Sequence, residues 1–248
     1  EAVDQYFDKH GKDTACVIVE PIAGNMNCVL PDVGFLEALR EQCTLNESVL
    51  IFDEVMTGFR VALGGAQSIY GVVPDITTLG KVIGGGLPIG AFGGKAEIMN
   101  KIAPEGAVYQ AGTLAGSPLA VAAGLAMLEI VSRENFYESL SKKTKLLMEG
   151  LEERASAADI PFTTNHAGGM FGCFFNKNSK VKTFNEVMES NNENFQIYFH
   201  EMLNNGVYLA PSMYEAGFIS MAHTENEIEK TLDAAGLAFE VIKKTNVG

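Results

Sequence analysis

The sequence predicts an α/β fold with a mostly parallel sheet, followed by a smaller α+β domain. Two observations support the α/β part: continuous apolar runs that favour β-strands recur in the first half of the chain, and helical patterns separate them. A third observation is a change of composition towards long amphipathic segments. We therefore expect residues 1–132 to form part of a larger domain and residues 133–248 to form a smaller α+β domain.

The predicted strands of the first domain show little alternation of polar residues, which is typical of parallel strands covered on both faces. A helix-like segment leads directly into the first strand, and "DVGFLEALREQC" (32–43) predicts a helix after it, because its apolar residues recur at helical spacing. "GGGLPIGAFGG" (84–94) predicts a loop followed by a strand. The three parallel strands are expected at "CVIVE" (16–20), "VLIF" (49–52) and "ITTL" (76–79).

Helices dominate the rest of the chain. Ser117 precedes Pro118, which predicts a helix start with serine as the N-cap and proline at the first helical position. An amphipathic helix is expected over residues 136–156, and the spacing of Thr224 and Glu227 predicts a capping box at the start of the last helix. Shorter elements are expected between these helices: strands at 168–175 and 207–210, and a polar loop with a helix beside it at 176–196.

Composition excludes several classes of function. The net charge of −13, with only four arginines, repels phosphate backbones, so we expect no nucleic-acid partner. The apolar runs are too short to cross a bilayer, so we expect no membrane association. The four cysteines form no CxxC pair and the four histidines are isolated, which predicts free thiols, a cytoplasmic protein and no metal site.

Charged side chains follow two of the predicted strands where each strand ends. Asp53 and Glu54 come directly after one strand, and Lys81 follows the next, with glycines on its far side. Open α/β sheets bind their ligands at the carboxyl ends of the strands. A lysine near a carboxylate, with bulk removed on one side, suits covalent chemistry on a pyridine cofactor such as pyridoxal phosphate (PLP). Taken alone, the pattern also arises from surface ion pairs and turns.

Three stretches, in this order, closely resemble the class III aminotransferases of PLP fold type I. They are "IFDEVMTGFR" (51–60), "PDITTLGKVIGGGLPIGAFGG" (74–94) and "YQAGTLAGSPLA" (109–120). The resemblance extends over essentially the whole chain. It implies a PLP-dependent enzyme of fold type I that acts on a small molecule, with pyridoxamine phosphate as a second cofactor form and a homodimer in which one subunit contacts the other's phosphate.

The resemblance also implies a role for individual residues. Lys81 is implied to bond to the cofactor and move protons, Asp53 to pair with the pyridine nitrogen, and Val55 to pack against the ring. The other implied residues are Asn25 near the phenolic oxygen, Gly112 and Thr113 at the phosphate across the dimer interface, and Glu215 at the substrate end. From the pattern alone, a core position for Val55 and turn or solvated positions for the rest stay open.

Two departures accompany the resemblance. Ser117 stands where the family pattern has asparagine, and both residues are good N-caps. The chain begins without Met, and the resemblance places it in the C-terminal portion of a family member. The N-terminal portion normally carries further phosphate contacts, an aromatic on the other ring face and the groups that grip the substrate carboxylate. We therefore expect the isolated fragment to hold the cofactor poorly, and a non-catalytic module is the alternative from another class.

Overall fold

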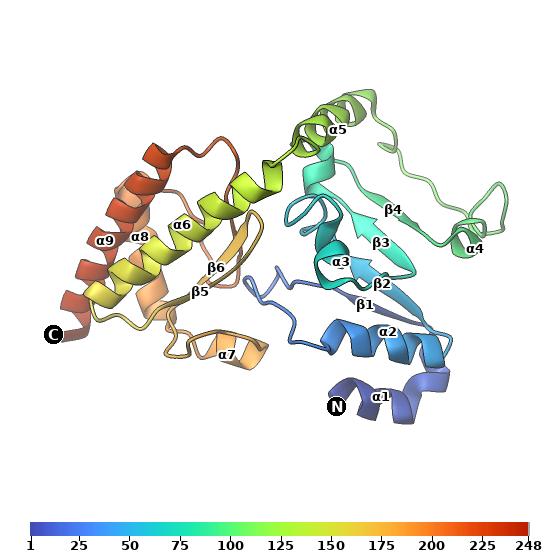
Figure 1. Cartoon of the computed structure of the whole chain (residues 1–248), viewed down its shortest axis with the longest axis horizontal. Coiled ribbons are helices and arrows are strands. Elements are labelled where there is room, and N and C mark those ends of the chain that lie inside the picture. Colours follow the sequence, from blue (N-terminus) through green and yellow to red (C-terminus); the bar gives the residue numbers. More distant parts are fainter. Residues whose placement is uncertain (248) are drawn as a thin grey trace. The chain divides into compact units, whose positions relative to one another are not determined.

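The computed structural model describes residues 1–247, and the chain divides into two compact units (Figure 1). The first unit consists of Glu1–Pro21 and Pro31–Glu134. The second combines Ile22–Leu30 with the residues from Asn135 onward. Each unit has its own sheet and its own buried cluster of apolar side chains.

A four-stranded sheet organises the first unit. Its strands lie in the order β1-β2-β3-β4, with β1, β2 and β3 parallel and β4 antiparallel to β3. The three predicted parallel strands are therefore confirmed, and the glycine-rich segment ends in the fourth strand. The strands are β1 (Cys16–Val19), β2 (Val49–Asp53), β3 (Ile76–Leu79) and β4 (Ala91–Gly94).

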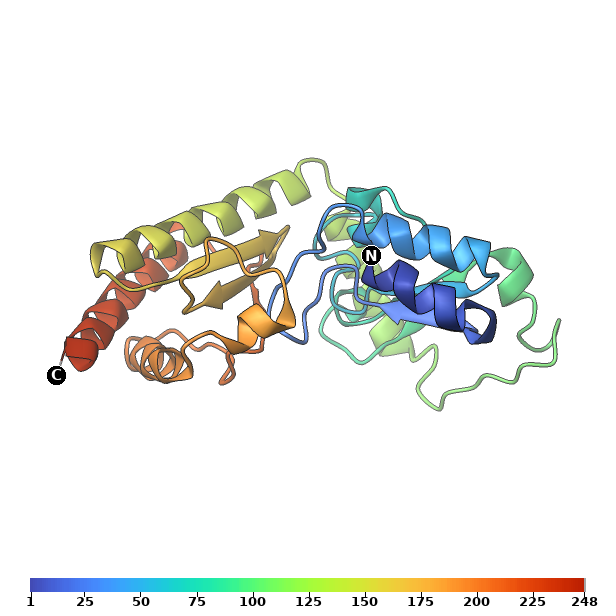
Figure 2. The same ribbon diagram turned by 90° about the horizontal axis from the view of Figure 1, so that it is seen from below.

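Helices cover one face of this sheet. Helix α2 packs against β1 and β2, and α1 packs against α2 (Figure 2), burying Leu36, Leu50 and Phe52 in one apolar cluster. The expectation of parallel strands covered on both faces is wrong for β1 in the described chain, because Ile18 is 60% exposed. The helices are α1 (Ala2–His10), α2 (Phe35–Leu45), α3 (Gly65–Tyr70), α4 (Ala96–Met99) and α5 (Pro118–Val131).

Helix α5 begins as the sequence predicts, with Ser117 at the N-cap and Pro118 in the first turn. The Ser117 side chain, however, makes no capping hydrogen bond, so proline rather than the serine hydroxyl favours this helix start. Within the described residues, no helix is both long enough and apolar enough to cross a membrane.

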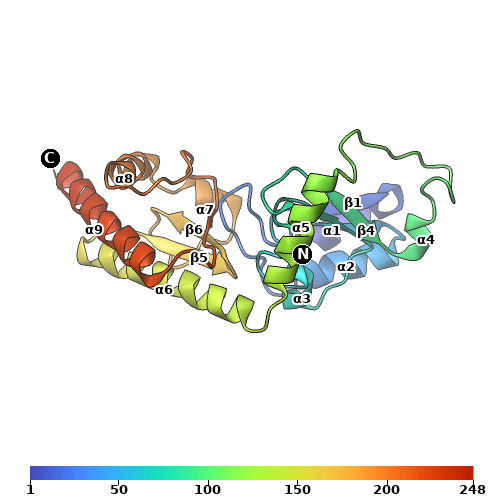
Figure 3. The same ribbon diagram turned by 90° about the horizontal axis from the view of Figure 1, so that it is seen from above.

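The second unit packs three long helices beside a small antiparallel sheet of order β5-β6-β7. Helices α8 and α9 lie side by side (Figure 3) and, with α6, bury Leu147, Leu151, Tyr198, Met202 and Phe239. The elements are α6 (Phe136–Ala157), β5 (Thr163–Ala167), β6 (Met170–Phe174), α7 (Phe184–Met188), α8 (Asn192–Asn204), β7 (Gly217–Phe218) and α9 (Glu225–Val247).

Several predictions for the second unit are confirmed and one is wrong. The amphipathic helix, the strand over 168–175 and the helix beside the polar loop are present. Residues 207–210 are irregular rather than a strand. Val207 and Leu209 pack against the apolar cluster while Tyr208 is 78% exposed, so the alternation comes from packing without a ladder partner.

The segment 22–30 belongs with the second unit, although the sequence analysis assigns it to the first domain. Asn27 Nδ2 donates to the carbonyls of Cys173 at 3.1 Å and Met213 at 2.8 Å. Asn165 Nδ2 donates to the Cys28 carbonyl at 2.9 Å, and Val29 packs against Phe174 and neighbouring apolar side chains. Local sequence patterns do not reveal these long-range contacts. The contacts place nine residues of the predicted first domain in the second unit.

Candidate active site

Asp53 is the last residue of β2, and its register partner on β3 is Thr78. Two donors hold one oxygen of its half-buried carboxylate: the backbone N–H of Val55 at 3.0 Å and the Thr78 hydroxyl at 3.2 Å, both to Oδ1. Within residues 1–247, no group donates to Oδ2. The carboxylate is therefore fixed through one oxygen and keeps the other available to a ligand.

Glu54 serves the opposite face of the sheet and is fully buried. Its carboxylate accepts hydrogen bonds from the Thr57 hydroxyl at 2.9 Å, the Ala66 N–H at 2.6 Å, and the backbone and side-chain amides of Gln67, both at 3.1 Å. Ala66 and Gln67 lie in the first turn of α3, so Glu54 satisfies N–H groups that have no partner within the helix. Glu54 therefore anchors the start of α3 to the end of β2.

Lys81 begins a short 3₁₀ turn, Lys81–Gly84, just beyond the end of β3. Its backbone has φ of 44°, in the left-handed region that non-glycine residues seldom adopt, and such strain costs about 1–3 kcal/mol. The side chain is exposed and forms no ion pair with any described residue. The fold therefore presents a free amine at the carboxyl end of the strand next to Asp53.

The absence of a side chain at Gly80 allows Val55 to lie close to the backbone of this turn. A Cβ on Gly80 would lie 3.1 Å from Val55 Cγ1, closer than side chains normally approach. Val55 thus packs against the backbone that leads into Lys81, on the segment that directly follows Asp53. The structure brings Asp53, Val55 and Lys81 together at the ends of neighbouring strands.

Helix α5 supports the Lys81 turn through backbone contacts that the sequence analysis did not predict. A Cβ on Gly124 would lie 2.2 Å from the Ile83 carbonyl oxygen, and one on Gly85 would lie 2.5 Å from the Ala123 carbonyl oxygen. Gly85 also has φ of +56°. The glycine run after Lys81 and the small residues of α5 were visible in the sequence, but their mutual contact depends on the tertiary fold.

Gly112 and Thr113 lie in the turn that precedes α5. The Ala115 N–H donates to the Gly112 carbonyl at 3.0 Å, and the exposed Thr113 hydroxyl has no hydrogen-bond partner among residues 1–247. A Cβ on Gly112 would meet only ordinary contacts, so packing within the chain does not require glycine there.

The remaining two predicted site residues belong to the second unit. Asn25 is exposed in the segment 22–30, and Glu215 is exposed after a turn closed by its N–H and the Ser212 carbonyl at 3.2 Å. Glu215 also lines a largely apolar cavity of about 60 Å³ inside that unit. The first-unit residues and these two therefore come from different units.

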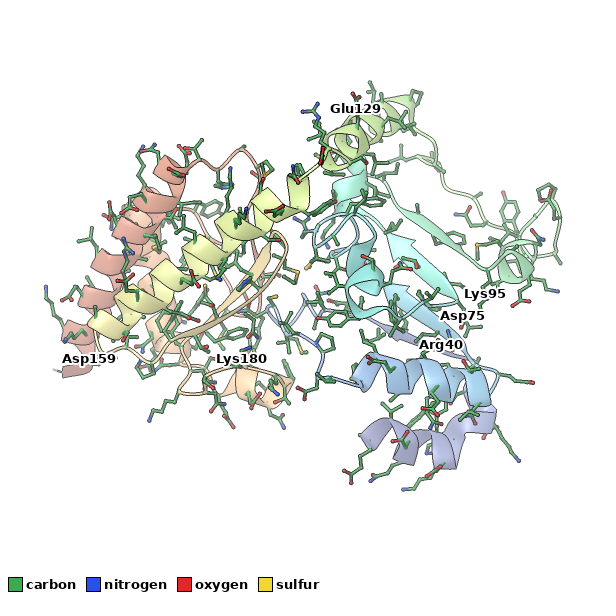
Figure 4. All side chains as sticks on the ribbon, in the orientation of Figure 1. Arg40, Asp75, Lys95, Glu129, Asp159 and Lys180 are labelled. Atoms are coloured by element: carbon green, nitrogen blue, oxygen red, sulfur yellow. The ribbon has the colours of Figure 1, made fainter. Side chains whose placement is uncertain are left out.

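A charged cluster holds the starts of β2 and β3 together on the first unit (Figure 4). Asp75, directly before β3, accepts from the Leu50 N–H at 2.7 Å and from Arg40 at 2.9 Å, and its other oxygen pairs with Lys95 at 2.7 Å. Burial alone would raise the pKa of Asp75, but these donors outweigh burial and lower it below its ordinary value of 3.8. This cluster fixes the strand ends opposite to those that carry Asp53 and Lys81.

The first-unit residues fit a pyridine cofactor that bonds covalently to an amine. Lys81 supplies an unpaired amine, and Asp53 Oδ2 supplies an acceptor for a protonated ring nitrogen. Val55 supplies an apolar contact beside them. A mostly parallel sheet that carries this set at its strand ends is the arrangement of PLP fold type I.

Residues 1–232 match the family described as aminotransferase class-III, and the chain belongs to that family. A β-phenylalanine aminotransferase from Variovorax paradoxus is 30% identical, with a TM-score of 0.85 over 95% of this chain and 54% of that one. An ω-transaminase from Sphaerobacter thermophilus is 28% identical, with a TM-score of 0.85 over 96% of this chain and 54% of that one.

A glutamate-1-semialdehyde aminomutase from Pseudomonas aeruginosa has the same fold, with 24% identity and a TM-score of 0.80 over 96% of this chain and 53% of that one. This chain therefore spans about half the length of the structures it matches. Among the matched structures, one transaminase holds bound PLP, and a variant of the Pseudomonas enzyme is in complex with PMP, the pyridoxamine phosphate form.

Proposed function

We propose that this chain carries half of the active site of a PLP-dependent class III enzyme, with Lys81 and Asp53 as its central residues. The observation that carries this proposal is a pair of neighbouring strand ends: the segment after β3 presents the free Lys81 amine, and the end of β2 carries a carboxylate whose Oδ1 is fixed and whose Oδ2 is available. The chemistry that bound PLP supplies is the withdrawal of electrons from the carbon that bears the substrate amine.

Each residue then has a defined task. Lys81 Nζ would hold the cofactor covalently, and it would take and return the proton of the substrate carbon. Asp53 Oδ2 would accept a hydrogen bond from the protonated ring nitrogen, and Val55 would supply an apolar contact to the ring. The other proposed contacts are Asn25 with the phenolic oxygen, Gly112 and Thr113 with the phosphate of the partner subunit in a homodimer, and Glu215 with the substrate.

Within this class we propose glutamate-1-semialdehyde 2,1-aminomutase as the activity, in the cytoplasm and in tetrapyrrole (porphyrin) biosynthesis. The reaction moves an amine within one molecule, converting glutamate 1-semialdehyde to 5-aminolevulinate with no external donor. The stretch "YLAPSMYEAGFISMAHTENEIEKTL" (208–232) supports it through its resemblance to these enzymes. No arginine follows Arg154 in the sequence, so this region has no arginine to grip the second carboxylate of an external keto acid.

Arg154 itself is already engaged on the surface of the second unit. Its guanidinium lies 3.5 Å from Glu229 and 3.8 Å from Asp233, both on α9. These acidic neighbours give the guanidinium a structural role between α6 and α9. This supports the aminomutase, which needs no further arginine in this region.

The second candidate is an ω-aminotransferase that exchanges its amine with an external keto acid. The similarity to the β-phenylalanine aminotransferase, at 30% identity against 24% for the aminomutase, favours it. The two candidates share the cofactor and Lys81, and they differ in whether a second substrate is required.

The test uses the full protein that carries this chain, loaded with pyridoxamine phosphate and given glutamate 1-semialdehyde without any other amino donor or acceptor. We expect repeated turnover to 5-aminolevulinate that is lost in Lys81→Ala and retained in Lys101→Ala, an exposed lysine of the same unit. Turnover that requires an added keto acid would identify the aminotransferase instead. A wild-type protein that holds no cofactor would support the non-catalytic alternative.

A further inference from the structure

We propose that Thr78 is a positioning residue for Asp53, fixing Oδ1 so that Oδ2 is free to accept the hydrogen bond of the cofactor's ring nitrogen. The inference rests on the proposed function and adds to it a residue whose task is to orient the carboxylate. It follows from the contacts of two neighbouring strands.

The first step concerns the freedom of the Asp53 carboxylate. The torsion that turns a carboxylate about its Cβ–Cγ bond has broad preferences, so contacts must fix its plane. Val55 N–H provides one contact, but it lies only two residues along the same segment. The Thr78 hydroxyl comes from β3, at 3.2 Å from the same oxygen, and is therefore the donor that ties the carboxylate to the sheet.

The second step compares Thr78 with Thr77, its neighbour on β3. The register pairs Thr77 with Phe52 and Thr78 with Asp53, so the two hydroxyls serve opposite faces of the sheet. Thr77 Oγ1 accepts from Gln67 Nε2 at 3.2 Å, in the network around buried Glu54. The Thr77 hydroxyl thus belongs to the buried network around Glu54, and the Thr78 hydroxyl lies on the face that carries Asp53.

The third step is the size of the effect. A hydrogen bond between an ionised carboxylate and a protonated ring nitrogen depends strongly on direction and is about twice as strong as a neutral one. A carboxylate that is free to turn loses part of this bond with the ring. We expect the loss of the Thr78 hydroxyl to weaken cofactor retention about tenfold, since hydrogen bonds to charged groups are of that order.

The experiment compares Thr78→Val, which removes the hydroxyl at nearly constant shape, with Thr78→Ser, which keeps it, and with Thr77→Val as the matched control. The full protein is loaded with PLP, and its dissociation constant is measured from the visible absorbance of the bound cofactor during dilution. We expect about tenfold weaker binding in Thr78→Val and near wild-type binding in Thr78→Ser and Thr77→Val. Thermal unfolding of the cofactor-free proteins reports folding separately, and Thr78→Ala is a second hydroxyl-free variant.

Each outcome decides between the possibilities. Wild-type retention of PLP in both hydroxyl-free variants would overturn the role of Thr78 and leave the proposed function standing. Equal losses in Thr78→Val and Thr77→Val, or no recovery in Thr78→Ser, would also overturn it, because the effect would then follow from packing. A wild-type protein that binds no PLP would overturn the proposed function itself, whatever the variants do.

Discussion

Gly124 of α5 lies against the carbonyl oxygen of Ile83, so closely that a Cβ on Gly124 would come within 2.2 Å of that oxygen. Ile83 belongs to the turn that begins with Lys81. The absence of a side chain at one helical position therefore determines how near the helix approaches the proposed catalytic turn. This relationship leads to the first prediction.

Gly124→Ala is expected to destabilise the protein by about 1–3 kcal/mol, because the added methyl group has no room beside the carbonyl. Gly236→Ala in α9 is the matched control, since its Cβ would meet Arg154 only at 3.7 Å. That change is expected to stabilise by about 0.5–1 kcal/mol, as alanine usually does within a helix. Urea unfolding of both variants measures the free energies, and a stabilised Gly124→Ala would contradict the close contact.

Conversion of the adjacent acids Asp53 and Glu54 into amides is expected to affect different properties: stability for Glu54 and cofactor binding for Asp53. Glu54→Gln replaces a buried acceptor oxygen by a donor that faces other N–H groups, so it should cost about 3 kcal/mol of unfolding free energy. Asp53→Asn keeps the acceptor for Val55 and Thr78 and should change stability by less than about 1 kcal/mol. Asp53→Asn should instead weaken PLP binding.

Thermal unfolding and cofactor titration of the two variants check this division. Equal destabilisation by both changes would mean that Asp53 is structural. A stable Glu54→Gln variant would contradict the role of Glu54 at the start of α3.

The left-handed backbone of Lys81 predicts an unusual order of stability. Lys81→Gly should be more stable than Lys81→Ala by about 1 kcal/mol, because glycine adopts φ of 44° without steric cost. At Lys145, an exposed position within α6, the order should reverse by about the same amount. Both pairs are compared by urea unfolding without cofactor. An Ala variant more stable than the Gly variant at position 81 would argue against the strained turn.

The cluster around Asp75 predicts a pH dependence. Its pKa lies below the ordinary 3.8 because donors from Lys95, Leu50 and Arg40 outweigh burial, so the folded protein holds the ionised form more strongly than the unfolded chain does. The resulting stability is complete above about pH 4 and is lost as the pH falls through the lowered pKa. Asp75→Asn should therefore cost about 2 kcal/mol at neutral pH and progressively less below pH 4. Urea unfolding of both proteins between about pH 3 and about pH 7 measures the difference in their unfolding free energies. A difference that does not change with pH would contradict the prediction.

Local patterns were sufficient for the elements whose residues interact with near neighbours. The apolar runs of β1, β2 and β3 and the N-terminal proline of α5 are examples, because both strand propensity and the fixed φ of proline act locally. The sequence also contains a second local signal, a capping box at Thr183 and Glu186, which marks the start of α7.

The remaining features depend on contacts between distant residues. The alternation at Val207, Tyr208 and Leu209 is equally compatible with a strand and with an irregular segment, and only the lack of a neighbouring strand decides between them. The hydrogen bond between Thr78 and Asp53 required the parallel register. For the site, the sequence indicated Lys81 and Asp53, whereas the glycine contacts that support the Lys81 turn required the packing of α5.

The placement of 22–30 with the second unit also has a consequence for dissecting the molecule. The polypeptide passes from one unit to the other at 21/22, 30/31 and 134/135, so the second unit is not one continuous stretch of chain. An expression clone that starts at residue 135 would omit Val29 and Asn27, exposing Phe174 and leaving the Cys173 carbonyl unbonded by Asn27. A self-contained version of this unit therefore calls for a circular permutation or a fusion that restores the nine-residue piece.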